Sequence, residues 1–192
     1  MTGDEILSLF RKSNALLRGH FELTSGLHSP QYLQCAKVLQ YPEHAERLCA
    51  EIANRFRNAA TDAVIAPALG GIVVGQEVGR QLGVRTMFAE RQNGELVLRR
   101  GFEISRGERV LVCEDVVTTG GSVREVAGIV NRCGGTVVGM AAIVDRSGGK
   151  AFPSDFFATM TMEVVTYTKE ECPLCREGLP VEKPGSRKSG PH

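Results

Sequence analysis

The sequence predicts an α/β fold in which a central, mostly parallel sheet carries helices on both faces. From residue 63 onward, short apolar runs alternate with stretches in which apolar residues recur at helical spacing. This alternation is typical of parallel sheets covered by helices. Ligands of such sheets bind at the carboxyl ends of the strands. We therefore expect the functional residues in the turns at 66–71, 114–122 and 145–149.

The first 60 residues predict two helices separated by an irregular segment. Apolar residues recur at helical spacing across residues 4–18, which predicts an amphipathic helix. Two glycines and Pro30 interrupt the segment 19–35, so no regular element is expected there. Pro42 suits the first turn of a second helix over 42–57.

The elements of the sheet follow in order. Each expected strand is a short apolar run, and glycines mark the helix ends. Asn93 and Gly94 indicate a hairpin or a mobile loop within 91–106. The expected elements are a strand at 63–66, a helix at 72–83, strands at 84–90 and 108–113, a helix at 120–135, a strand at 136–144 and a weaker strand within 155–167.

Length and composition indicate one domain. The 192 residues are enough to bury about 70% of the unfolded surface. The net charge of +1 argues against nucleic-acid or anionic-membrane binding, and the sequence has neither a membrane span nor a signal peptide. We expect a cytoplasmic protein with a single domain over 1–183, comprising an N-terminal hood at about 1–40 and a core at about 41–168, followed by a polar tail at 184–192.

One stretch, VLVCEDVVTTGGSV at 110–123, indicates a ligand with two chemically different ends. The turn at 118–122 precedes a helix, and amides and hydroxyls at a helix N-terminus bind phosphate. Glu114 and Asp115 would repel a second phosphate but accept hydrogen bonds from sugar hydroxyls. A phosphorylated pentose satisfies both parts. The simpler interpretation is that the acidic pair ends a strand and caps the next helix.

The same stretch closely resembles the signature with which type I phosphoribosyltransferases bind phosphoribosyl diphosphate (PRPP). The segments HFELTSGLHSPQYLQCAKVLQYPE, VIAPALGGIVVG and IVDRSGG resemble those of orotate phosphoribosyltransferases, and the likeness covers about residues 5 to 183. The resemblance implies the type I phosphoribosyltransferase fold with a small N-terminal hood. It also implies transfer of ribose 5-phosphate from PRPP to orotate in de novo pyrimidine (UMP) synthesis, with Mg²⁺ as cofactor, in a homodimer.

The resemblance also implies roles for individual residues. Mg²⁺ would be bound mainly through PRPP, assisted by Glu114 and Asp115, and the guanidinium of Arg146 would pair with the orotate carboxylate. Orotate would contact Thr118, Arg146, Tyr32 and Leu33. PRPP would contact Thr24, Ala68, Leu69, Gly70, Gly71, Arg91, Glu114, Asp115, Val116, Val117, Thr118, Thr119, Gly120, Gly121 and Ser122.

The sequence departs from the family pattern at its basic residues. Gly70 and Thr24 stand where many members have lysine, and the segment 91–106 carries no histidine. We expect Arg91, Arg99 and Arg100 to supply positive charge for the diphosphate, alongside Glu114 and Asp115 as catalytic residues. The alternative for Arg99 and Arg100 is a solvated basic pair.

Two other functions remain open at this point. The chain could be a phosphoribosyltransferase for another purine or pyrimidine base, or a non-catalytic regulator that senses PRPP or nucleotides. Arg146 and the N-terminal segment argue against the first, because both point to orotate. The balanced charge argues against a regulator that binds nucleic acid.

Cys172 and Cys175 form a C-x-x-C pair with three possible roles. They could be inert thiols, a redox pair, or half of a metal site that two chains of a dimer share, because zinc takes four ligands and the chain has no second such pair. His20, His28 and His44 are expected at helix ends or the surface, although His28 could touch PRPP. The other cysteines are expected to be buried free thiols: Cys35, Cys49, Cys113 and Cys133.

Overall fold

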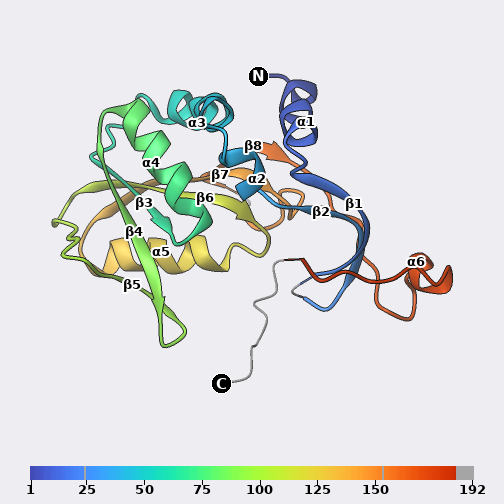
Figure 1. Ribbon diagram of the computed structural model, residues 1–192. Coiled ribbons are helices and arrows are strands. Elements are labelled where there is room, and N and C mark those ends of the chain that lie inside the picture. Colours follow the sequence, from blue (N-terminus) through green and yellow to red (C-terminus); the bar gives the residue numbers. More distant parts are fainter. Residues whose placement is uncertain (24, 153, 185–192) are drawn as a thin grey trace.

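The computed structural model describes residues 1–23, 25–152 and 154–184. Its body is a six-stranded sheet in the order β5-β4-β3-β6-β7-β8 (Figure 1). All neighbouring strands are parallel except β4 and β5, which confirms the predicted α/β class. The strands are β3 (Ala63–Pro67), β4 (Arg85–Gln92), β5 (Glu95–Leu98), β6 (Arg109–Val117), β7 (Thr136–Asp145) and β8 (Phe156–Thr161).

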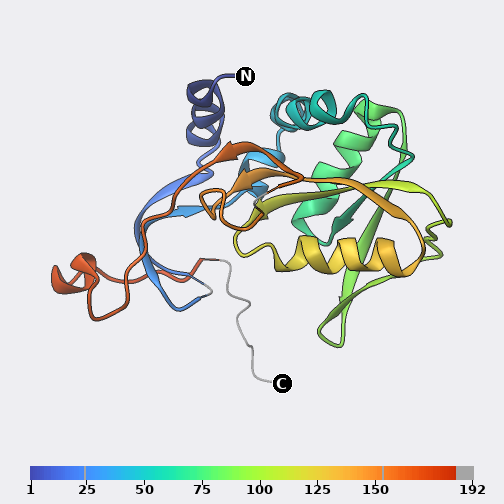
Figure 2. The same ribbon diagram turned by 180° about the vertical axis from the view of Figure 1, so that it is seen from behind.

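Helices cover both faces of the sheet. Helices α3 (Pro42–Phe56) and α4 (Gly70–Leu82) lie on one face, and α5 (Gly121–Arg132) lies on the other (Figures 1 and 2). Successive strand residues point to opposite faces. Leu111 thus belongs to the core under α3 and α4, whereas Val112 belongs to the core under α5. Burial on both faces explains why the strands are continuous apolar runs in the sequence.

The expected elements between residues 42 and 145 are confirmed. Pro42 is in the first turn of α3, and α4 ends at Gly83, whose φ of 71° is left-handed. The segment after β4 forms a hairpin with β5, and its turn residues Asn93 and Gly94 have φ values of 51° and 90°. The hairpin projects beyond α5 (Figure 1). In the described ranges, no helix combines the length and the apolar character that a bilayer span needs.

The predictions for the N-terminal segment are partly wrong. Helix α1 (Gly3–Lys12) is shorter than expected, because Asn14 has a φ of 50° that a helix cannot continue through. The segment taken as the end of a helix and an irregular run instead forms a two-stranded hairpin. It pairs β1 (Leu16–Glu22) with β2 (His28–Leu33), and the short helix α2 (Ala36–Leu39) follows.

Pro30 is tolerated in this hairpin because it sits in a bulge. Gln31 pairs with Arg18 and Ser29 with Phe21, so Pro30 has no partner across the register shift. Proline lacks the amide that a strand ladder needs, and bulges are where strands accept it. Pro30, which had argued against a strand in the sequence, therefore lies at the one irregular position of β2.

The C-terminal part of the chain returns to the β1–β2 hairpin. After β8, Tyr167 pairs with His28, and Glu182 pairs with Phe21. The short helix α6 (Pro173–Arg176) lies at the end of the hairpin away from the sheet in both views (Figures 1 and 2). Both ends of the chain thus build the hood. Of the expected tail, residues 185–192 lie outside the described residues.

Three side chains are not where the sequence suggested. His20 and His28 are each only 5% exposed, because the returning C-terminal segment covers the strands that carry them, so placing them at the surface was wrong. Cys133 is exposed rather than buried, because it lies just past the end of α5. The other three cysteines expected in the core are buried.

Candidate active site

Strands β3, β6 and β7 run in parallel, and the turns that follow them lie at one edge of the sheet. Three hollows of about 330, 360 and 420 Å³ meet there, and Thr118 lines all of them. The first contains the turn at 118–122, the second contains Ser25 and Thr166, and the third contains Gly70 and Asp115. The expected location at the carboxyl ends of the strands is therefore also where the chain is hollowed.

The turn at 118–122 is held in a form suited to an anion. Gly120 precedes α5 with a φ of 77°, and a β-carbon there would lie 2.6 Å from the ring of Phe152. Arg124 stacks over that ring, 4.7 Å from its centroid, and donates to the carbonyl oxygens of Thr119 and Ala151. The first amides of α5 lie at this turn, and a helix N-terminus favours a phosphate.

Glu114 and Asp115 lie inside β6 rather than beyond its end. The Asp115 amide donates to Glu114 Oε1 at 3.0 Å, and the Val116 amide donates to Asp115 Oδ1 at 2.9 Å. Burial, and next the neighbouring charge of Asp115, raise the pKa of Glu114 to about 9. Two adjacent carboxylates in a half-closed site gain from a cation or from hydroxyl donors. Oxygen ligands of this kind suit Mg²⁺, so the pair fits the expected cofactor.

Two glycines at the start of α4 face these carboxylates. A β-carbon on Gly70 would overlap the carboxylate of Asp115, and one on Gly71 would lie 2.9 Å from Glu114 Oε1. The absence of side chains lets the N-terminus of α4 approach both acids. The preceding Ala68–Leu69 peptide bond is cis, and Leu69 is 80% exposed at the rim of the third hollow.

Arg146 and Tyr32 line both the second and the third hollow. The Nε atom of Arg146 is buried and has no hydrogen-bond partner among the described residues. Burial lowers the pKa of its guanidinium. A buried donor without an acceptor is costly unless a ligand supplies one. A guanidinium binds the oxygen atoms of a carboxylate or a phosphate strongly, through two parallel hydrogen bonds.

The turn that carries Arg146 is fixed by Asp145, which is 2% exposed. Its carboxylate accepts hydrogen bonds from the Ser147 and Gly149 amides, both at 2.8 Å. The Arg146 amide itself donates to Val117 O at 2.8 Å. The guanidinium therefore projects from a rigid backbone next to the turn at 118–122.

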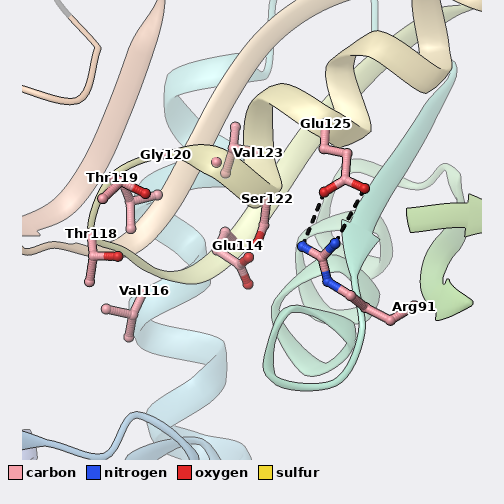
Figure 3. A pocket seen from close by; sticks show the side chains of 11 residues that line it. Arg91, Glu114, Val116, Thr118, Thr119, Gly120, Ser122, Val123 and Glu125 are labelled. Atoms are coloured by element: carbon pink, nitrogen blue, oxygen red, sulfur yellow. Dashed lines mark hydrogen bonds and ion pairs between the residues drawn. The ribbon is translucent and has the colours of Figure 1, made fainter. Parts of the chain in front are cut away.

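Arg91 lies across the first hollow from that turn (Figure 3). Its Nη2 atom is 3.0 Å from Glu125 Oε2, and Glu125 also accepts a hydrogen bond from the Leu96 amide of β5. Glu125 thus connects the β4–β5 hairpin to α5. Glu125 was not predicted from the sequence. The only feature that could have indicated its role is an acidic residue in the second turn of the helix that follows the turn at 118–122.

Arg99 and Arg100 line none of the three hollows. Arg100 forms two hydrogen bonds of 2.8 Å with Glu90 and lies over the ring of Phe88. Thr24 lies outside the described residues. The hollows bring together these expected residues: Tyr32, Leu33, Leu69, Gly70, Arg91, Glu114, Asp115, Val116, Val117, Thr118, Thr119, Gly120, Gly121, Ser122 and Arg146.

Comparison with known proteins agrees with this arrangement. Residues 36–169 match the family model described as the phosphoribosyl transferase domain. The orotate phosphoribosyltransferase of Chlorobaculum parvum is 59% identical over 188 residues, which are 97% of each chain. That of Pelotomaculum thermopropionicum is 57% identical over 189 residues, which are 98% of this chain and all of the relative.

Solved structures show the same fold at lower identity. Orotate phosphoribosyltransferase from Aeropyrum pernix superposes with a TM-score of 0.69 at 24% identity, over 82% of this chain and 93% of that one. Adenine phosphoribosyltransferase from Thermoanaerobacter pseudethanolicus gives a TM-score of 0.60 at 18% identity, over 69% and 88%. Proteins named for different bases share this fold, so the fold alone does not identify the base.

Proposed function

Because the chain belongs to the phosphoribosyltransferase family and shares more than half of its residues with relatives named orotate phosphoribosyltransferase, we propose that it forms orotidine 5′-monophosphate. Ribose 5-phosphate passes from PRPP to orotate, and diphosphate is released. The bond from the anomeric carbon to diphosphate breaks, a bond to a ring nitrogen of orotate forms, and that nitrogen loses its proton. The reaction belongs to de novo UMP synthesis.

One observation supports orotate as the base. The buried Nε of Arg146 lacks an acceptor among the described residues, and Arg146 lines hollows that also reach the turn at 118–122. Orotate carries a carboxylate, which uracil and adenine do not. A guanidinium in this position would favour the acid and leave a buried donor unpaired beside the other bases.

The residues perform positioning and charge stabilisation. The turn at 118–122 holds the 5′-phosphate, and Glu114 and Asp115 accept hydrogen bonds from the ribose hydroxyls. The anomeric carbon becomes positively charged as diphosphate leaves, so correct placement of the base and exclusion of water dominate catalysis. The β4–β5 hairpin, with Arg91 facing the first hollow, is the candidate for covering the reaction.

The proposed cofactor is Mg²⁺, held mainly by PRPP with help from Glu114 and Asp115. The raised pKa of Glu114, caused by burial and by the charge of Asp115, indicates a site that benefits from added positive charge. When bound, Mg²⁺ supplies charge that neutralises the departing diphosphate. The glycines at 70 and 71 carry no side chain that would displace the two carboxylates that would assist in holding it.

We also propose a cytoplasmic homodimer. Tyr41, Leu69 and Val73 are exposed apolar side chains, and Val73 lines a further hollow of about 350 Å³ with mostly apolar walls. Leu69 belongs to the active-site rim, so a second copy on this surface would lie next to the site. Val73→Glu should yield monomers in light scattering.

The free cysteines of the described residues fit a reducing compartment, which supports the proposed cytoplasmic location.

The decisive experiment follows orotate absorbance and diphosphate release together after mixing the protein with PRPP and Mg²⁺. Equal consumption of orotate and production of diphosphate supports the proposal. Parallel assays with uracil and adenine should show at least about a hundredfold lower kcat/KM, because those bases leave Arg146 unpaired. Turnover of another base with none of orotate would overturn it.

A further inference from the structure

Four side chains with metal-binding atoms converge in the hood, away from the active site. They are His20 of β1, His28 of β2, Cys172 immediately before α6, and Cys175 within α6. Their ligand atoms all lie within 4.8 Å of one another. Cys172 is fully buried and the two histidines are 5% exposed. None of the four is among the residues that line the three active-site hollows.

Two of the separations match the N···S edge of a coordination tetrahedron, and the other two are shorter. Zinc bonds of about 2.0–2.1 Å to nitrogen and 2.3 Å to sulfur place a tetrahedral N···S pair about 3.6 Å apart. His20 Nε2 lies 3.6 Å from both Cys172 Sγ and Cys175 Sγ, and Cys175 Sγ lies 3.2 Å from His28 Nδ1. The two imidazole nitrogens are closer, at 2.7 Å. Small movements would admit an ion at the centre.

The imidazole of His20 is oriented as in a metal-bound histidine. His20 Nδ1 lies 2.8 Å from the carbonyl oxygen of Leu179, which can only accept, so Nδ1 of the neutral ring carries the proton and Nε2 presents a lone pair to the cluster. His28 Nδ1 and both sulfur atoms lie next to this Nε2, and Cys175 Sγ also lies next to His28 Nδ1. A backbone carbonyl on the outer nitrogen is also the usual support of a metal-bound histidine.

We propose that His20, His28, Cys172 and Cys175 bind one structural Zn²⁺ per chain. Zinc displaces the two thiol protons, and two thiolates with two neutral imidazoles make the site electrically neutral, which suits its burial. Four protein ligands fill a tetrahedral shell and leave no position for a substrate, so the ion is structural. The proposal is independent of the transferase activity.

The ion would stabilise the part of the hood where apolar side chains remain exposed. Val165, Leu179 and Val181 of the returning segment are each about half exposed, and the β1–β2 hairpin is only two-stranded. Small units of this kind are marginal without a metal or a disulfide. The ion would tie both strands to the C-terminal segment, whose Val164 and Thr166 line the second hollow with Tyr32. Its loss would loosen that wall.

The test is the metal content of the purified full chain, with and without substitutions. Native mass spectrometry and elemental analysis should find about one zinc per chain. Cys172→Ser and His28→Ala should each lose it, whereas the matched control Cys133→Ser, at an exposed cysteine outside the cluster, should keep it. Chelation should lower the unfolding midpoint of wild type by at least about 5 °C, and added zinc should restore it.

Wild type alone can decide the question if the variants do not fold. Exchange with Co²⁺ should give the visible bands of a tetrahedral ion with thiolate ligands. A protein that is isolated without zinc and retains none after incubation and desalting overturns the proposal. So does a Cys172–Cys175 disulfide in the active protein, which would indicate redox chemistry. One zinc per two chains would overturn the assignment of all four ligands to one chain.

Discussion

The carboxylate of Asp115 lies so close to the backbone of Gly70 that a β-carbon on residue 70 would overlap its Oδ2 atom. A β-carbon on Gly71 would likewise lie only 2.9 Å from Glu114 Oε1. The start of α4 can pack against the acidic residues of β6 only because residues 70 and 71 have no side chains. Any side chain at position 70 would displace Asp115, so this part of the site cannot carry a lysine without moving the carboxylate.

Gly70→Ala should reduce kcat/KM for PRPP by about tenfold or more, because the methyl group moves Asp115 away from the ribose hydroxyls. Steady-state kinetics at varied PRPP measure it. The matched control is Gly128→Ala within α5, where a β-carbon would meet only the mobile end of Arg132 and activity should persist. Equal kinetics for both variants would contradict the role given to the close approach.

Arg146→Met should raise the KM for orotate by about 10- to 100-fold, because a charge-assisted contact is lost. The same variant should unfold at equal or higher urea concentration than wild type, since its buried Nε has no partner without ligand. The KM of Arg146→Lys for orotate should lie between the values of wild type and Arg146→Met. An unchanged orotate KM in Arg146→Met would remove this residue from the base site.

Glu114→Gln should change how stability depends on pH in the absence of Mg²⁺ and PRPP. Burial raises the folded-state pKa of Glu114 from 4.5 to about 9, so the folded protein holds a proton that the unfolded chain has released. Wild type should therefore lose stability relative to the variant as pH rises from about 5 to about 9, by up to about 1.4 kcal/mol per pH unit. Urea unfolding of both proteins across this range measures the difference. Parallel stability curves would show that Glu114 titrates normally.

The double variant Arg99→Ala and Arg100→Ala should lower kcat by at least about tenfold if these arginines supply diphosphate charge. Arg100 is bonded to Glu90, so its loss could act through the hairpin instead. Glu90→Gln separates the two effects, because it breaks that ion pair and keeps both arginines. The hypothesis fails if the double variant turns over at the wild-type rate, or if Glu90→Gln reproduces its loss.

The sheet could be predicted from the sequence because its signals are local. The runs 63–66 and 137–144 contain no polar side chain. Gly83 and Asn93 have positive φ values, which glycine and asparagine adopt more readily than other residues. The hairpin at the N-terminus could not be predicted in this way. Leu16 and Leu17 continue the helical period of α1, and the bulge that accommodates Pro30 depends on the opposite strand.

The candidate site was predictable in its residue types and not in its contacts. The composition of the turn at 118–122 predicts a phosphate-binding site. The pairing of Arg91 with Glu125 and the approach of Gly70 to Asp115 arise only when separate elements pack together. The metal-binding cluster is the extreme case, because His20 and Cys172 are 152 positions apart. Neither the two histidines nor the two cysteines alone supply the four ligands that would identify a zinc site in the sequence.

The return of the C-terminal segment to the β1–β2 hairpin sets an order on synthesis. Every residue of the first hollow has left the ribosome once residue 125 has emerged, but the second hollow also needs Val164 and Thr166, and Glu182 must pair beside Phe21. The β1–β2 hairpin is therefore synthesised long before Tyr167 and Glu182, which pair with it. The turn at 118–122 also depends on a later part of the chain, because Arg124 donates to the carbonyl oxygen of Ala151 and Gly120 lies against the ring of Phe152. Neither hollow can therefore be complete when only the residues up to 125 have emerged.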